Sequence, residues 1–221
     1  MNEQQFYTST EVRPLYPEII PVYQRAFAGE PWFEVSACED EQTRCVGGFS
    51  RQQQGESCLT CQQTLMRSAY PAAELEARFD SFATDRPAVW YLERFNCQLS
   101  LAAVAWKATV PAIVAERYAD VPAMGAWLPE TLGETQEITW LDEVFADRTV
   151  KPGGNLQNFG AMVLGIARRL ETPLVAYRTI ASQMTKAALR DFDTSARVFQ
   201  RQKDVPDRRD LVIINTAGGS L

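Results

Sequence analysis

Four of the five cysteines in the chain lie within one short segment, as Cys38, Cys45, Cys58 and Cys61. Their spacing, C-x6-C-x12-C-x2-C, ends in the tight pair CLTC. In a reducing compartment, cysteines at such spacing are better explained as metal ligands than as disulfides. Four sulfur atoms match the closed tetrahedral coordination of structural zinc, because no position remains open for water. We therefore predict a structural zinc site at these four cysteines.

The loop that contains these cysteines has a composition that favours ordering by a metal. The stretch from Arg44 to Gln63 contains almost no large apolar side chains, so burial alone could not hold it together. Zinc binding supplies about 10 to 16 kcal/mol to isolated zinc-finger peptides. Residues 35–64 are thus expected to form an inserted zinc loop, with iron, a redox pair at CLTC, or cysteines without metal as alternatives. Cys97, in an apolar stretch, is predicted to be a small core residue.

Two amphipathic helices are predicted on either side of the cysteine loop, over residues 17–27 and 71–82. In both segments apolar side chains recur at helical spacing, and GEPW ends the first helix. Residues 88–95 and 99–109 are short, apolar and rich in aromatic residues, which is typical of consecutive strands. Pro111 then begins a further helix.

The C-terminal half alternates strands and helices. Strands are predicted over residues 137–146, 174–179, 196–202 and 210–216, and helices over residues 156–171 and 182–192. Ser182 is placed to cap the second of these helices. This alternation predicts an α/β fold with a mixed sheet and helices on its faces.

Composition and charge exclude several functional classes. The chain has 221 residues, of which 46% are hydrophobic and 23% charged, as in soluble globular proteins. A net charge of −6 argues against a broad nucleic-acid surface, because phosphate binding needs a surplus of Lys and Arg. No segment reaches membrane-spanning length and no secretory signal is recognisable, so we expect a cytoplasmic protein. The absence of histidine leaves Glu, Asp, Tyr, Cys or Lys for acid and base chemistry.

The loop between the strand at 137–146 and the following helix is a candidate anion site. Its sequence, KPGGN-LQNFG, leads into the first turn of the helix, where backbone N–H groups are unpaired and the helix dipole is positive. Asn155 is well suited to cap that turn. The loop matches neither the P-loop nor the dinucleotide fingerprint, and many turns of this kind bind nothing.

Several of these segments together resemble the GNAT superfamily of acyl-CoA-dependent N-acyltransferases. The resemblance rests on AFAGEPWFE, on LDEVFAD with the loop and helix after it, on LVAYRT, and on the terminal strand pair. It covers residues 15–216 except the cysteine loop, which is an insertion. It implies one domain over residues 1–221, with a mixed, mostly antiparallel central sheet of six to seven strands flanked by helices.

The resemblance also implies where acyl-CoA binds. In GNAT proteins the diphosphate lies on a loop with the motif Arg/Gln-x-x-Gly-x-Gly/Ala, at a helix N-terminus. Aligning this motif in phase with the helix places Asn155 at its first position, Asn158 at its first glycine and Gly160 at its last; a shifted register begins at Gln157. The implied cofactor-binding residues are Val144, Phe145, Ala146, Asn155, Gln157, Asn158, Phe159 and Gly160.

The same resemblance implies a candidate mechanism. Glu143, on the strand before the loop, is the expected general base, and the backbone N–H of Val144 or a neighbour is expected to polarise the thioester carbonyl. Asp142 should point to the opposite face of a regular strand. GNAT enzymes often use a tyrosine acid in the helix over residues 182–192, but that position holds Leu189, while Tyr177 is expected in the core or the cleft wall.

These observations favour an N-acetyltransferase that moves an acetyl or acyl group from acyl-CoA to a primary amine by direct attack. Acetyl-CoA is the expected co-substrate, zinc the expected structural ion, and a homodimer is compatible with the sequence. The cysteine loop is expected to be a flap beside the acceptor side of the cleft. The alternatives are a catalytically degenerate GNAT-fold binding module and a zinc knuckle that binds a partner protein.

Overall fold

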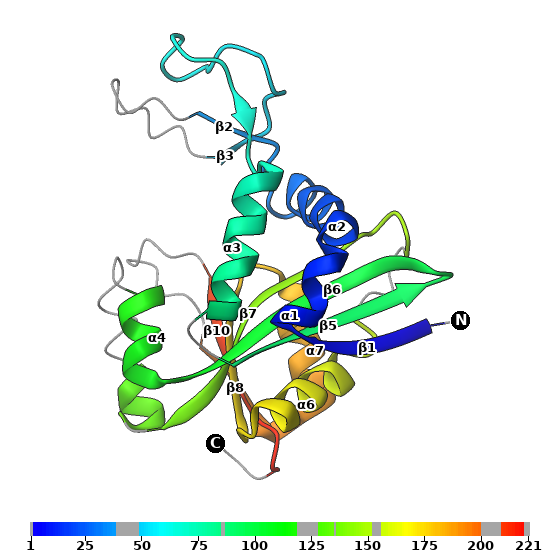
Figure 1. Cartoon of the computed structure of the whole chain (residues 1–221). Helices are drawn as coiled ribbons and strands as arrows, with labels where there is room; N and C mark the ends of the chain where they lie inside the picture. The colour runs from blue at the N-terminus through cyan, green and yellow to red at the C-terminus, as the bar shows by residue number, and fades with distance from the viewer. Residues whose placement is uncertain are drawn as a thin grey trace.

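A seven-stranded sheet forms the centre of the computed structural model (Figure 1), with strand order β1-β5-β6-β7-β8-β10-β9. The structure describes residues 2–38, 49–84, 87–118, 128–134, 136–151, 156–199 and 209–218. The strands of this sheet are β1 (Asn2–Thr8), β5 (Ala88–Phe95), β6 (Gln98–Thr109), β7 (Glu137–Ala146), β8 (Leu174–Thr179), β9 (Ala196–Phe199) and β10 (Asp210–Asn215). Every pairing in it is antiparallel except β7 with β8. The predicted mixed, mostly antiparallel sheet is therefore confirmed.

Helices cover both faces of the sheet because its strands are apolar on both sides. The helices are α1 (Ser9–Val12), α2 (Tyr16–Ala28), α3 (Ala72–Thr84), α4 (Val110–Arg117), α6 (Phe159–Leu170) and α7 (Ser182–Phe192), with short 3₁₀ turns at η1 (Arg13–Leu15) and η2 (Asp193–Ser195). Trp90 and Leu92 of β5 pack toward α2 and α3, and the alternate residues Val89 and Tyr91 pack toward α6. None of the described helices is both long and apolar enough to cross a bilayer.

The parallel pair β7 and β8 separates part of the way along the sheet. The two strands pair at Thr139↔Val175 and Trp140↔Ala176, and beyond Trp140 β7 continues to Ala146 beside β6. On the β6 side the register shifts between Val104 and Ala105, so that Asp142 is the extra residue of a β-bulge. This separation opens the sheet next to the candidate catalytic residues.

Two local expectations are wrong, and one strand was not predicted. The polar N-terminal residues form that strand, β1, which pairs with β5 along its whole length. Cys97 is exposed, because Asn96 and Cys97 both have positive φ and form the turn between β5 and β6. Ser182 is the first residue of α7 and not its cap; the N-cap is Ala181, whose side chain offers no hydrogen bond.

The cysteine segment forms a small three-stranded sheet of its own. Its strands are β2 (Ser36–Ala37), β3 (Phe49–Ser50) and β4 (Arg67–Ser68), in the order β3-β2-β4. In Figure 1 this sheet projects from the body of the molecule next to α2 and α3. Cys38 and Cys58 are buried in it, whereas Cys45 lies outside the described residues.

Candidate active site

Two cavities meet where β7 has left β8. The larger, of about 650 Å³, is lined by Val144, Phe145 and Ala146 of β7, by the turn before α6, and by α7. The smaller, of about 300 Å³, contains Glu143. Val144 lines both, as do Phe27, Trp32 and Met184. The splayed strands thus place two neighbouring cavities on either side of one short segment of β7.

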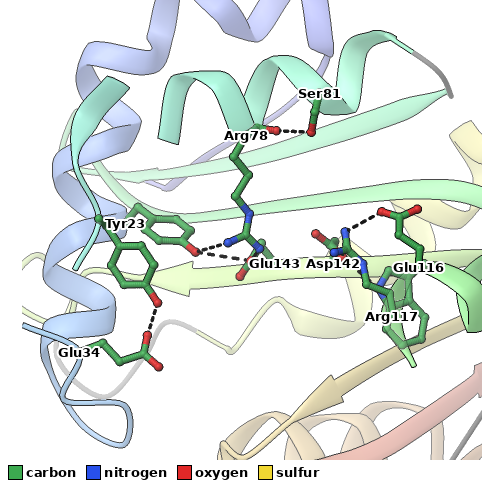
Figure 2. A network of polar contacts seen from close by, with 10 residues as sticks. Tyr23, Glu34, Arg78, Ser81, Glu116, Arg117, Asp142 and Glu143 are labelled. Atoms are coloured by element: carbon green, nitrogen blue, oxygen red, sulfur yellow. Dashed lines mark hydrogen bonds and ion pairs between the residues drawn. The ribbon is translucent and has the colours of Figure 1, made fainter. Parts of the chain in front are cut away.

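Glu143 lies in a polar cluster built from three elements (Figure 2). It forms an ion pair with Arg78 of α3, and its Oε1 accepts a hydrogen bond from the hydroxyl of Tyr23 on α2 at 3.4 Å. Arg78 also donates to the Tyr23 hydroxyl, at 3.4 Å. The Glu143 side chain is 12% exposed, so it reaches the cavity while most of its surface is covered.

Burial raises the pKa of Glu143 to about 7, although the positive charge of Arg78 acts in the opposite direction. The cause is the cost of holding a carboxylate away from water. Burial, and next the charge of Glu143, also raise the pKa of Tyr23, which therefore stays protonated. A carboxyl group whose pKa lies near neutrality is suited to accept a proton at physiological pH.

Asp142 and Glu143 both line the smaller cavity, so the expectation that they face opposite sides is wrong. The bulge at Asp142 interrupts the alternation on which that expectation rested. Asp142 forms a 2.7 Å ion pair with Arg117 of α4 and accepts a hydrogen bond from Trp140 Nε1 at 3.0 Å. These contacts hold Asp142 in place next to Glu143 (Figure 2).

Another part of the smaller cavity's wall comes from the residues just before β2 and just after β4. The small sheet of β2, β3 and β4, with its cysteines, is called the cysteine module below. The hydroxyl of Tyr70, which follows β4, donates a short hydrogen bond to Glu34, which precedes β2. Burial raises the pKa of both Tyr70 and Glu34, and the hydrogen bond to Tyr70 opposes the shift of Glu34. The site therefore includes residues next in sequence to strands β2 and β4.

Sequence reasoning missed Tyr23, Glu34, Tyr70 and Arg78 as members of the site. Of these four, only Arg78 has a sequence pattern that could have indicated a buried site, because it lies on the same apolar helix face as Leu75, Phe79 and Phe82. A charged residue at such a position requires a buried partner.

The turn before α6 differs from the anion site that the sequence predicts. Helix α6 begins at Phe159, and the amide N–H of Gly160 donates to Asp191 Oδ2 of α7 at 2.8 Å. A carboxylate of the same chain thus occupies the amide that the sequence assigns to a diphosphate. Asn155 lies outside the described residues.

The other predicted cofactor residues divide between the cavity and the interior. Val144, Phe145, Ala146 and Gln157 line the larger cavity. Phe159 is 1% exposed and belongs to the core. The side chain of Asn158 points away from the cavity, because its Nδ2 donates to the buried carboxylate of Glu93 at 3.1 Å.

Glu93 connects the turn before α6 to the centre of the sheet. It is 1% exposed and accepts from Asn158, from Lys151 Nζ at 2.7 Å and from the Tyr91 hydroxyl at 3.0 Å. Lys151 and Asn158 lie on either side of the undescribed residues 152–155, so one buried carboxylate holds both ends of this turn.

The charges around the larger cavity favour an anionic ligand. Arg148, Lys186 and Arg190 line it, with Glu30 as the one acidic residue among its described lining residues. Arg190 also donates to the backbone carbonyl of Leu156 at 2.9 Å and pairs with Asp191. The remaining wall is largely apolar, which suits a ligand with a phosphorylated end and an apolar end.

A mostly antiparallel seven-stranded sheet, opened between its parallel strands and covered by helices on both faces, is the fold that the sequence resemblance predicts. The structure is similar to a mosquito arylalkylamine N-acetyltransferase-like protein 5b, with a TM-score of 0.55 at 8% identity, covering 97% of this chain and 100% of that one. It is similar to the Drosophila melanogaster polyamine N-acetyltransferase that forms N-acetylagmatine, with a TM-score of 0.50 at 11% identity over 97% and 98% of the two chains. It is also similar to FeeM, an N-acyl amino acid synthase from uncultured soil microbes, with a TM-score of 0.50 at 10% identity over 98% and 92%.

No protein-family model and no curated protein matches the sequence. The chain has the GNAT fold, as the resemblance in its sequence predicts, and the low identities make this a statement about fold alone.

Proposed function

We propose that this protein is an acyltransferase that moves an acyl group from a CoA thioester to a primary amine. One observation supports this above all: the two cavities meet at Val144, next to a carboxyl group whose pKa lies near neutrality. The larger cavity has room and positive charge for the acyl-CoA, with acetyl-CoA as the first candidate. The smaller cavity then receives the amine.

The proposed reaction is direct attack. The amine nitrogen bonds to the carbonyl carbon of the thioester while Glu143 accepts the proton that the amine loses, and the carbon–sulfur bond then breaks to release the CoA thiolate. Val144 lies on the edge of β7 that has left β8, so its backbone N–H, or one beside it, is the candidate donor to the carbonyl oxygen. A thiolate is a fairly good leaving group, so no dedicated acid is required.

The CoA diphosphate is assigned to the part of the larger cavity near Gln157 and the basic side chains of Arg148, Lys186 and Arg190. Asp191 occupies the Gly160 amide that would otherwise bind it, so full use of the helix N-terminus requires the Asp191 carboxylate to turn away. Arg190, which pairs with Asp191, would then be released toward the phosphates.

Calorimetric titration with acetyl-CoA, followed by an assay that detects released CoA thiol with a panel of amines, tests the proposal. The panel should contain agmatine, polyamines, arylalkylamines and amino acids. We expect saturable acetyl-CoA binding and amine-dependent thiol release that Glu143→Gln reduces by about 10² to 10⁴-fold. Glu137→Gln, on the exposed end of the same strand, is the matched control. No binding of acetyl-CoA or of longer acyl-CoA at millimolar concentration would refute the proposal.

A second function, a GNAT-fold binding module without catalysis, is favoured by the contact between Asp191 and the Gly160 amide. Thermal unfolding distinguishes the two functions. A ligand at a hundred times its Kd stabilises the folded state by about 2.7 kcal/mol, so acetyl-CoA should raise Tm if the cavity binds it. Clear protection by acetyl-CoA would speak against the degenerate binding module, whereas an unchanged Tm would support it.

A further inference from the structure

The Sγ atoms of Cys38, Cys58 and Cys61 all lie within 4.8 Å of one another, and Cys38 and Cys61 are 3.7 Å apart. Cys38 and Cys58 are buried and Cys61 is partly buried. We propose that these three thiolates bind one zinc ion that stabilises the module formed by β2, β3 and β4. The proposal rests on this cluster and is independent of the proposed acyl transfer.

The sulfur spacing agrees with zinc coordination. A zinc–sulfur bond of about 2.3 Å in tetrahedral geometry places neighbouring sulfur atoms about 3.8 Å apart. The observed 3.7 Å between Cys38 and Cys61 matches this spacing. A disulfide would require about 2.05 Å. The cluster therefore has the dimensions of a metal site and not of a disulfide.

The local chemistry also favours a thiolate. The backbone N–H of Thr60 donates to the sulfur of Cys58 at 3.4 Å, which stabilises negative charge on that atom. The tight turn of the CLTC segment is closed by the Gln62 amide donating to the Cys58 carbonyl at 2.8 Å. This turn brings Cys58 and Cys61 onto the same side, facing Cys38.

The module has too little apolar burial to explain its fold. Its described core consists of Cys38, Cys58 and Met66, with Cys61 packed against it. Its two described leucines, Leu59 and Leu65, are 77% and 62% exposed and contribute little. Each of its strands has two residues, far below the size at which a sheet is stable by itself. A metal at the sulfur cluster supplies the missing free energy, as in other small metal-dependent folds.

The module connects directly to the smaller cavity. The amide of Val35 donates to Ser50 of β3 at 3.0 Å, and the amide of Ala69 donates to the Val35 carbonyl at 3.3 Å. The neighbours of these residues, Glu34 and Tyr70, bond to each other in the cavity wall. Zinc at the cysteines therefore fixes the two chain segments that position Glu34 and Tyr70.

Metal analysis of the full-length protein, purified under reducing conditions, tests the proposal. We expect one zinc per chain by elemental analysis and by native mass spectrometry, and loss of that zinc in Cys58→Ser and in Cys61→Ser. Cys97→Ser is the matched control, because Cys97 is an exposed thiol in the turn between β5 and β6. It should retain one zinc per chain.

Substitution with Co²⁺ in the wild-type protein keeps the test decisive if the serine variants fail to fold. Cobalt bound by several thiolates gives intense thiolate-to-metal charge-transfer absorption, which zinc should then displace. Four results would overturn the proposal. The protein could remain without metal after reconstitution with zinc, or it could contain a coloured iron centre. Two of the three cysteines could form a disulfide, or the Cys58→Ser variant could retain zinc. Failure to bind acetyl-CoA would leave the proposal unaffected.

Discussion

Removal of Arg78 should move the pH dependence of catalysis in a predictable direction. Burial raises the pKa of Glu143 to about 7, and Arg78 is the largest influence that lowers it. On the proposed function, kcat/KM for the amine rises with pH as Glu143 loses its proton, with a midpoint near that pKa. In Arg78→Met the carboxylate loses its positive partner while burial remains, so the midpoint rises.

The magnitude follows from the close contact between the two groups. An opposite charge within about 4 to 6 Å shifts a carboxyl pKa by about 1 to 3 units. The midpoint should therefore move from about 7 toward about 8 to 10. At pH 7 the ionised fraction of Glu143 then falls from about one half to between about one tenth and one thousandth. The rate at pH 7 falls in proportion, and part of it is recovered at higher pH.

The assay is the pH profile of CoA thiol release for wild type, Arg78→Met, Glu143→Gln and a control. Arg13→Met is the matched control, because Arg13 forms an ion pair with Asp80 that lies on the exposed surface. The same profile measured with a second amine of different pKa shows whether the fall in rate at low pH reflects a group of the enzyme or of the substrate. An acidic limb that stays in place in Arg78→Met, or that persists in Glu143→Gln, would refute the assignment of Glu143 as the base.

Three other perturbations have expected outcomes that follow from single contacts. Asp191→Ala releases the Gly160 amide, so acetyl-CoA should bind more tightly in calorimetry, and an unchanged or weaker affinity would contradict a diphosphate site there. Glu93→Ala leaves the buried ammonium of Lys151 without its partner and should reduce the free energy of unfolding in urea by about 3 to 5 kcal/mol, whereas an effect below 1 kcal/mol would show that the pair is unimportant. Gly165→Ala places a methyl group against the ring of Phe6 and should cost about 1 to 3 kcal/mol in the same assay; unchanged stability would show that the ring moves aside without cost.

The sequence alone indicates the elements whose pattern is local. The strands β5 to β8 and the helices α2, α3, α6 and α7 were predictable, because burial against a sheet or a helix face imposes a period on the residues involved. The cysteine spacing predicts a metal site, and three of its four members lie together. Glu143 is the expected base because it precedes a glycine-containing loop in a strand that resembles its GNAT counterpart.

Long-range packing decides the rest. The hydrogen bond between Tyr23 and Glu143 joins residues 120 positions apart, and no local pattern specifies such a contact. The polar residues of β1 form a strand because β5 offers them an open edge. The bulge that lets Asp142 and Glu143 face the same cavity depends on the register between β6 and β7.

The contact between Asp191 and the α6 amide has the same origin, since two helices that are separate in the sequence must first pack together. The sequence by itself determines which segments can become strands, helices and a thiolate cluster, because those properties depend on residue type and spacing. Only the tertiary structure decides which charged groups meet in the cavity, because it brings distant segments together and removes them from water.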